Sequence, residues 1–536
     1  MKPTSMDRIA ILLAMIIMLS FSIRLYPTLL TGLPFSTDSW PLISNTENLL
    51  ELTPISLEDR AFDGYNNYWP ASQIFGAVSS IILDAKVLDV ERLLFPAAAS
   101  LAVIPFYVVV RKTTGSRISA TISSLLLALG SYQAIFTSGV TKETFTLALF
   151  FTYLALAFMT GSTVERKILL FIAGAAIVMG HHLQYFLLLA ILLNMLILRF
   201  FLRRVDDESF TDSLTPLVPL LIVGSIYYPL YALRGITFSL TTSDILSLIS
   251  FQVLSYLLQY YLLTGAVKPP IKLFIIWAAS YMVLAANQFF PVMPASPRIP
   301  ASLSIQLSII FMLGVFTIIG LDSLKRRGSV VKMYHVVGWL SALLFLEAYS
   351  MFGAQPSMSL GLFYRIANHI LPPVSILSSI GLVKIMDLFK SKRVGVVCLT
   401  IILLPISLTM VYQHYSSTIL QENYLGYQWM YSMAEYELAS WLSRNIDNVR
   451  VCGDMKVSYL LEGYFKVKVD VGGGFKILND GAVSGETLLI IYRVMEKNGY
   501  VLGLYGVKLR DHWAGNIVER ADKIFSNILT EAYRLL

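Results

Sequence analysis

The residue best suited to acid–base chemistry is an aspartate near the start of the chain. Asp38 stands in Ser36-Thr37-Asp38-Ser39-Trp40, directly before an apolar run. A carboxylate can remove the proton of an attacking hydroxyl when the two groups lie within hydrogen-bond reach. A helix N-cap is the alternative role for Asp38. Trp40 fits either a substrate contact or an anchor at the membrane interface.

A second acidic residue and a pair of histidines stand at the ends of other apolar runs. Lys142-Glu143 follows Thr141, a pattern that fits either a capped first turn of a helix or a charged site. His181-His182 follows Gly180. Successive residues on a helix point about 100° apart, so these two histidines would rarely hold one metal ion together.

An arginine inside an apolar stretch indicates a phosphate ligand. Arg365 stands in Tyr364-Arg365-Ile366-Ala367-Asn368-His369. Charges within a bilayer are costly and by default mark function. A guanidinium pairs with phosphate through two hydrogen bonds. Arg365 is therefore our candidate for binding a phosphate group, with Lys142, Arg298, His181, His182 and His369 as further substrate contacts.

The composition decides which elements must position these residues. Of 536 residues, 56% are apolar and only 14% are charged, against about 25% charged in soluble domains. The mean hydropathy is +0.66. These values exclude a soluble multidomain enzyme and a disordered chain, and two cysteines exclude a disulfide scaffold. We expect a polytopic α-helical membrane protein.

Thirteen apolar stretches are long enough to be candidate membrane helices, which need about 20 residues each. They lie near 9–30, 92–110, 118–138, 143–160, 167–181, 183–202, 214–233, 244–264, 271–290, 300–321, 333–353, 363–389 and 394–414. The shorter stretch 70–83 is expected to lie along the outer surface, because counting it as a span would invert every later loop.

The distribution of basic residues predicts the orientation. If the N-terminus is cytoplasmic, the inside segments carry 18 Lys and Arg residues and the outside loops up to residue 414 carry 6. This bias follows the positive-inside rule, and it accounts for the net charge of +7 without a nucleic-acid partner. We therefore expect an integral plasma-membrane protein with its C-terminal part outside the cytoplasm.

Two domains are predicted. Residues 1–414 form the membrane domain, with 31–91 as a long acidic first outside loop, and 415–536 form a small α/β domain outside the membrane. The second domain is predicted from an amphipathic helix at 424–446, followed by short β-type runs near 449–452, 466–471 and 487–492. The ionisable residues beside the spans collect at the outer ends, which predicts one polar pocket there.

The whole pattern resembles the GT-C superfamily of membrane glycosyltransferases. It looks like an archaeal member that is distantly similar to the oligosaccharyltransferase catalytic subunit and to protein O-mannosyltransferases. The resemblance rests on Asp38-Ser39-Trp40, Tyr65-Asn66-Asn67-Tyr68-Trp69-Pro70, Arg92-Leu93-Leu94-Phe95-Pro96, Ser138-Gly139-Val140-Thr141-Lys142-Glu143, Tyr364-Arg365, Leu371-Pro372-Pro373, Ala434-Glu435-Tyr436-Glu437-Leu438-Ala439-Ser440-Trp441-Leu442 and Val451-Cys452-Gly453-Asp454.

The resemblance implies roles for individual residues. The catalytic acid of the first loop maps onto Asp38, the acidic position of the second loop onto Glu143, and the phosphate-binding cation onto Arg365. It implies a polyprenyl- or dolichyl-phosphate-linked sugar donor and an unknown acceptor. A divalent metal, Mg or Mn, is left open, and Asp38 and Glu143 are its expected ligands if one binds.

The chain also departs from the oligosaccharyltransferase pattern. Cys452-Gly453-Asp454-Met455 stands where that subunit has Trp-Trp-Asp-Tyr-Gly, and Lys142-Glu143 replaces an Asp-x-Asp pair. These departures favour transfer from a lipid monophosphate to an acceptor hydroxyl. Two alternatives stay open: oligosaccharyltransferase-like transfer to protein, and a polytopic lipid or solute transporter. A non-catalytic scaffold is a third possibility.

Overall fold

The structure is a computed structural model. It describes residues 5–52, 64–159, 161, 163–201, 214–235, 241–264, 269–287, 289–290, 301–326, 330–354, 356–419, 428–446, 449–481, 485–503, 505–510, 513 and 521–535. The chain divides into two compact units, each assembled from three stretches of sequence. The first unit comprises residues 1–21, 99–134 and 146–413, and the second comprises residues 22–98, 135–145 and 414–536.

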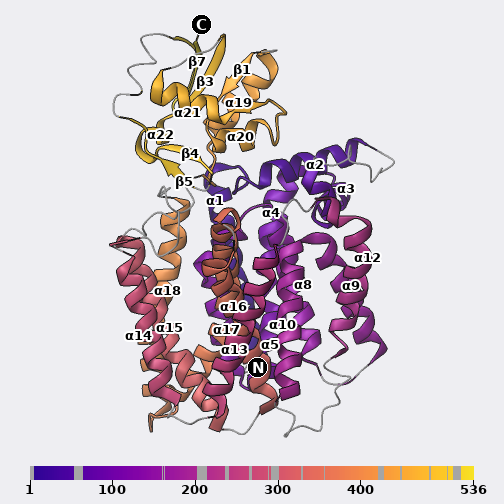
Figure 1. The fold of residues 1–536 in the computed structure, drawn as a ribbon, viewed down its shortest axis with the longest axis vertical. Helices are drawn as coiled ribbons and strands as arrows, with labels where there is room; N and C mark the ends of the chain where they lie inside the picture. The colour runs from indigo at the N-terminus through magenta and orange to yellow at the C-terminus, as the bar shows by residue number, and fades with distance from the viewer. Residues whose placement is uncertain are drawn as a thin grey trace. The chain divides into compact units, whose positions relative to one another are not determined.

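The first unit is a bundle of apolar helices (Figure 1). Its helices, some of which continue into the second unit, are α1 (Ser5–Thr31), α5 (Val103–Thr114), α6 (Arg117–Leu129), α7 (Ser131–Phe136), α8 (Lys142–Ala157), α9 (Val164–Gly180), α10 (His182–Phe201), α12 (Leu217–Leu230), η2 (Ala232–Gly235), α13 (Thr242–Thr264), α14 (Pro269–Ala286), α15 (Ala301–Arg326), α16 (Val330–Phe352), α17 (Pro356–Met386) and α18 (Lys392–Thr418).

Most stretches predicted to span the membrane correspond to one helix, whereas 92–110 covers parts of α4 (Val87–Ser100) and α5, and 118–138 covers α6 and α7. Seven segments of the described chain are both long and apolar enough to cross a bilayer: Ile9–Thr31, Val87–Thr114, His182–Phe200, Ala301–Leu324, Tyr334–Phe352, Gly361–Met386 and Lys392–Thr418. The prediction of an integral membrane protein is confirmed. The count of thirteen spans is not, and it stays a prediction.

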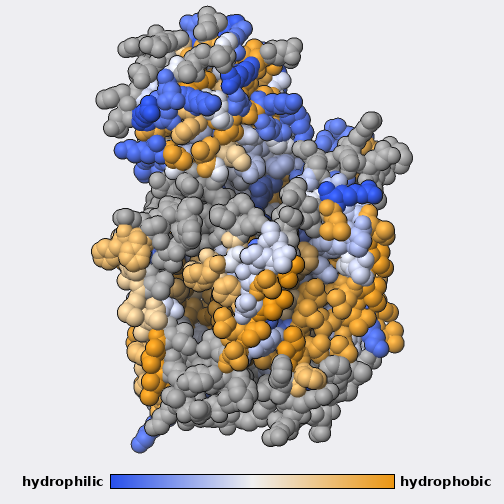
Figure 2. All heavy atoms as spheres, viewed as in Figure 1, coloured by the Kyte–Doolittle hydropathy of each residue, from blue (hydrophilic) through white to orange (hydrophobic). Residues whose placement is uncertain are grey.

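Hydrophobic side chains cover the outer surface of the bundle. Helix α9 exposes Val164, Ile168 and Ile172, and α12 exposes Ile226 and Leu230, each more than half accessible. Figure 2 shows hydrophobic atoms gathered over this part of the surface. In water such a surface would be unfavourable, whereas in a bilayer the acyl chains solvate it.

Glycines and small polar side chains join the buried helix contacts. A Cβ at Gly320 of α15 would lie 2.0 Å from the carbonyl oxygen of Leu377, and one at Gly381 of α17 would lie 2.0 Å from that of Phe316. The two backbones therefore touch, which is how membrane helices gain contact area without a hydrophobic driving force. The Asn194 amide donates to the carbonyl of Gly338 at 2.6 Å.

The second unit begins with helices of the first long loop. They are α2 (Ser39–Glu51), η1 (Gly64–Tyr68), α3 (Ala71–Leu83) and α4 (Val87–Ser100). Helix α3 buries its polar and small residues Ser72, Gln73, Gly76 and Ser80. On this buried face, Gly76 lies against the buried Glu91. The Glu91 carboxylate accepts a hydrogen bond from the Thr46 hydroxyl of α2 at 2.8 Å.

The last part of the second unit is a mixed sheet with helices (Figure 1). Its elements are α19 (Met433–Asn445), β1 (Arg450–Cys452), α20 (Met455–Leu461), β2 (Val469–Asp470), α21 (Val471–Asp480), β3 (Thr487–Tyr492), α22 (Arg493–Asn498), β4 (Tyr500–Leu502), β5 (Tyr505–Val507), β6 (Asp522–Ser526) and β7 (Thr530–Leu535). The strand order is β2-β1-β3-β7-β6. Strand β1 is parallel to β2 and β3, and β7 is antiparallel to β3 and β6.

The small C-terminal α/β region is therefore confirmed, with one difference in detail. The runs near 449–452, 466–471 and 487–492 contain β1, β2 and β3, while the helix predicted from residue 424 begins at Met433 among the described residues. The glycines 472–474 lie in the first turns of α21, and Asp470 caps that helix by accepting a hydrogen bond from the Gly473 amide at 2.7 Å.

Candidate active site

Asp38 is an exposed carboxylate on a buried segment. Thr37, Ser39 and Trp40 are at least nine-tenths buried, whereas Asp38 itself is exposed. Ser36 has φ +83°, a left-handed conformation that is rare for a residue with a Cβ. Asp38 precedes α2 but its side chain makes no capping hydrogen bond. The carboxylate therefore does not cap α2, and it stays exposed although the residues on both sides of it are buried.

The first and second loops are joined directly beside this residue. Phe35 forms a parallel β-bridge with Gly139. The amide of Val140 donates a hydrogen bond at 2.8 Å to the Ser39 hydroxyl, which in turn donates to the Phe35 carbonyl. A Cβ at Gly139 would lie 2.1 Å from the Phe35 carbonyl oxygen, so only glycine allows this approach. The segment that carries Asp38 is thereby fixed to the one that leads to Glu143.

The second loop then enters α8 with its charged pair buried. Thr141 caps the helix, because its hydroxyl accepts a hydrogen bond from the Thr144 amide at 3.0 Å. Lys142 and Glu143 are 7% and 6% exposed. The Lys142 ammonium lies 3.9 Å from the ring centroid of Tyr65, a cation–π contact. Thr141 supplies the helix cap, so the charged pair is not needed for that function.

Two polar residues that sequence reasoning did not select also support the second loop. The Arg24 guanidinium is 1% exposed and donates to the Thr137 hydroxyl at 2.8 Å. His414 lies 3.4 Å from the Ser138 hydroxyl. The hydrogen-bond partner of Arg24 lies 113 residues away, a pairing for which the sequence gives no signal.

Trp40 is placed in the protein interior. It is fully buried, and its ring contacts Tyr431, Tyr436 and Tyr464 from the C-terminal part of the same unit. Because its ring is fully buried, Trp40 reaches neither the bilayer interface nor an exposed substrate.

Four further candidates belong to the first unit. Arg365 is half-buried on α17, and His369, one turn further, is 1% exposed with its ring 5.3 Å from that of Phe150. His181 is extended between α9 and α10, and its Nδ1 accepts a hydrogen bond from the Gln184 amide. Because the helix breaks there, the rings of His181 and His182 stack at 5.2 Å rather than pointing apart. Arg298 lies outside the described residues.

A divalent metal ion needs several ligand atoms in one place. Mg²⁺ is usually bound through one or two carboxylates together with waters and substrate phosphates. Over the described ranges, no three His, Cys, Asp or Glu side chains are grouped so that they could hold an ion. Asp38 and Glu143 remain the predicted ligands if a metal binds.

Asp454 has a structural role in the C-terminal region. It is fully buried and accepts hydrogen bonds from the Tyr492 hydroxyl and from the amides of Val457 and Val501. Burial raises its pKa from 3.8 to about 6, and the three hydrogen bonds oppose this shift. All of its bonding partners are thus within the domain, which leaves Asp454 inaccessible to a substrate.

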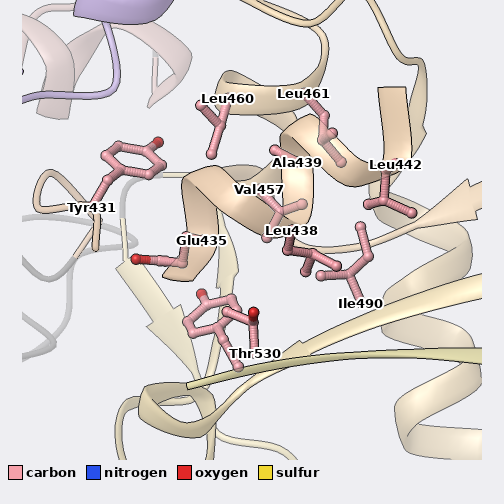
Figure 3. Close-up of a pocket in the computed structure, with 11 residues that line it drawn as sticks. Tyr431, Glu435, Leu438, Ala439, Leu442, Val457, Leu460, Leu461, Ile490 and Thr530 are labelled. Atoms are coloured by element: carbon pink, nitrogen blue, oxygen red, sulfur yellow. The ribbon is translucent and has the colours of Figure 1, made fainter. Parts of the chain in front are cut away.

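A pocket opens nearby between α19, α20 and β3 (Figure 3). Leu438, Leu460 and Ile490 line it, with Glu435 and Tyr431 at its polar end. Glu435 is already engaged, because it forms the capping box of α19 with Ser432 and a buried ion pair with Lys456. The pocket is therefore an apolar slot without a free catalytic group among its described lining residues.

The architecture matches known structures. The apo crystal structure of the Archaeoglobus fulgidus oligosaccharyltransferase matches 91% of this chain and 70% of its own, with a TM-score of 0.60 and 12% identity. The chain has the fold of this protein. The complex of archaeal AglB with an inhibitory peptide and a dolichol-phosphate gives a TM-score of 0.58 and 11% identity, over 91% of this chain and 70% of that one.

A crystal structure of the Archaeoglobus fulgidus oligosaccharyltransferase in complex with Zn and sulfate gives a TM-score of 0.59 at 13% identity, over 91% of this chain and 68% of that one. No family model and no curated protein matches the sequence. At these identities the likeness concerns the fold alone.

Proposed function

We propose that this chain is a glycosyltransferase that moves a sugar from a polyprenyl-phosphate donor to an acceptor hydroxyl at the outer membrane face. The observation that carries the proposal is the exposed carboxylate of Asp38, held on a buried and strained segment beside the second loop in a GT-C fold. A dolichol-phosphate is bound in one of the similar structures, which supports a lipid-linked donor.

The reaction follows from the residue types. Asp38 takes the proton of the acceptor hydroxyl as that oxygen attacks the anomeric carbon of the sugar. A bond forms between the acceptor oxygen and the anomeric carbon, and the bond from that carbon to the phosphate oxygen breaks. The lipid phosphate leaves with the electron pair and needs a positive charge to stabilise it.

Arg365 is our candidate for that charge. It lies within the apolar segment Gly361–Met386, where a cation is costly unless it has a function, and its guanidinium suits phosphate. Glu143 is the proposed second carboxylate, and Lys142, His181, His182, Arg298 and His369 are further proposed substrate contacts. The polyprenyl chain would lie among apolar helices, with the N-terminus cytoplasmic and the transfer outside.

A transfer assay with purified protein in lipid nanodiscs tests the proposal. A radiolabelled polyprenyl-phosphate sugar is the donor, and lipid, glycan and peptide acceptors are compared. Asp38→Asn should lose about 10²–10⁴-fold in rate, the usual contribution of a general base. Asp89→Asn is the matched control, because Asp89 is an acid of the same loop that pairs with Arg92 at the surface. Equal transfer by all three proteins would refute the role of Asp38.

The same assay separates the rival functions. Asparagine glycosylation predicts transfer to a peptide only, and the proposal predicts transfer to a hydroxyl. A transporter predicts that no new glycosidic bond forms with any acceptor. A transporter also usually places its ionisable groups near the bilayer midplane.

A further inference from the structure

Trp40 links the segment that carries Asp38 to the C-terminal part of the chain. Its ring lies 5.3 Å from Tyr431, 5.9 Å from Tyr436 and 5.6 Å from Tyr464, measured between centroids. Two of these contacts are edge-to-face and one is stacked. Such aromatic pairs add about 0.5–1.5 kcal/mol each beyond the area they bury. We call these three tyrosines the Trp40 cage.

Contacts on both sides of Trp40 reinforce the link. Before it, the Ser36 amide donates to the Trp429 carbonyl at 2.7 Å. After it, the Tyr464 hydroxyl donates to the Glu47 carboxylate at 3.1 Å. Gly463 packs against Pro41, because a Cβ there would lie 3.1 Å from the Pro41 Cδ. The first turns of α2 are thus held by residues 429–464 at several successive points.

Asp38 lies between these attachments and takes no part in them. Its side chain makes no capping bond and is exposed, so its position depends on the backbone at residues 36, 39 and 40. The negative charge of Asp38 also contributes to the pKa of a tyrosine in the C-terminal region. The pKa of Tyr431 is raised well above its usual value, first by burial and then by carboxylates that include Asp38.

We propose that the C-terminal region positions the carboxylate of Asp38, and that Trp40 in its cage is the positioning residue. This inference rests on the proposed function of Asp38, and it assigns the C-terminal region a role in catalysis rather than only in covering the site. A displacement of about 1 Å at a reacting group can cost about 10²-fold in rate.

The test compares three variants of the full chain in nanodiscs. Trp40→Ala should lower kcat for sugar transfer about 100-fold while KM for the lipid donor stays within about twofold, because donor contacts are unchanged. Trp40→Phe should recover much of the rate, because it keeps a ring in the cage. Trp441→Ala is the control, since Trp441 lies in α19 with Tyr436 but its ring packs on Phe525 of β6.

Hydrogen exchange gives a readout that needs no activity. In Trp40→Ala, amides of residues 33–46 should exchange faster, while those of β3 and β7 stay as protected as in the wild type. An unchanged kcat in folded Trp40→Ala, or an equal loss in Trp441→Ala, overturns the inference. If Asp38→Asn keeps full activity, the proposed function fails, but the exchange result still decides whether the cage holds the loop.

Discussion

Replacing Gly381 with alanine should loosen the packing of α15 against α17. The new Cβ would lie 2.0 Å from the carbonyl oxygen of Phe316 and 2.9 Å from its carbon. Both atoms belong to a helix backbone, so no side chain can rotate away. The two helices must separate by about 1 Å or more to restore ordinary contact distances, and overpacking of this kind typically costs about 1–3 kcal/mol.

The separation would also strain hydrogen bonds next to the contact. The Ser378 hydroxyl donates to the Leu313 carbonyl at 2.9 Å and lies 2.9 Å from the Thr317 hydroxyl. Interhelical hydrogen bonds in membranes contribute about 0.6 kcal/mol each on average. The expected loss of stability for Gly381→Ala is therefore about 2–4 kcal/mol.

Gly361→Ala is the matched control on the same helix. A Cβ at Gly361 meets nothing within 4 Å, so the change should be neutral or stabilise the helix by up to about 1 kcal/mol. Thermal unfolding of both purified variants in detergent, read by loss of monodisperse protein, measures the difference. Equal unfolding temperatures for Gly381→Ala and the wild type would refute the backbone contact between α15 and α17.

Further predictions concern the second unit. The pKa of Asp454 is raised to about 6 in the folded protein. Its contribution to the free energy of unfolding, about 3 kcal/mol, is therefore fully present below pH 4 and is lost as the pH rises through 6. In urea unfolding at a series of pH values, the wild type should lose this stability between pH 4 and 6 and Asp454→Asn should not; parallel pH profiles of the two proteins would contradict the prediction. Gly76→Ala should destabilise by about 1–3 kcal/mol, because its Cβ would lie 1.7 Å from Oε1 of the buried Glu91; Gly472→Ala, where the nearest atom is 3.8 Å away, should not. For the orientation, a membrane-impermeant maleimide should label Ile528→Cys but not Leu388→Cys in intact cells, both sites being exposed; the reverse pattern would invert the topology.

The sequence predicted the membrane helices well because length and apolar content decide them. Each of the expected spans is helical, although 92–110 and 118–138 are each divided between two helices, and the surface stretch 70–83 corresponds to α3 (Ala71–Leu83). Strands β6 and β7 were missed, because short edge and central strands in a polar tail carry little periodicity. The break at His181 was predicted, since the expected spans 167–181 and 183–202 meet beside it, and α9 ends at Gly180 where α10 begins at His182. The stacking of the His181 and His182 rings was not predicted.

The sequence supplied candidate residues for the site but not the contacts between their segments. Asp38 and Glu143 were selected from their residue types and from the family resemblance. The β-bridge between Phe35 and Gly139, which joins their two segments, could not be predicted because these residues lie about 100 positions apart. Trp40 was interpreted as an anchor or a substrate contact, whereas its partners are tyrosines about 390 to 425 residues later. Aromatic residues are common in membrane proteins, so neither member of such a pair identifies the other.

The central claim is that Asp38 removes the proton of the acceptor while the lipid-linked sugar is bound. Single-turnover transfer from a preloaded donor tests it most directly, because substrate binding and chemistry are then measured separately. The account predicts that Asp38→Asn binds the polyprenyl-phosphate sugar as tightly as the wild type and transfers it at least about 100-fold more slowly. Transfer at the wild-type rate by fully loaded Asp38→Asn would contradict it.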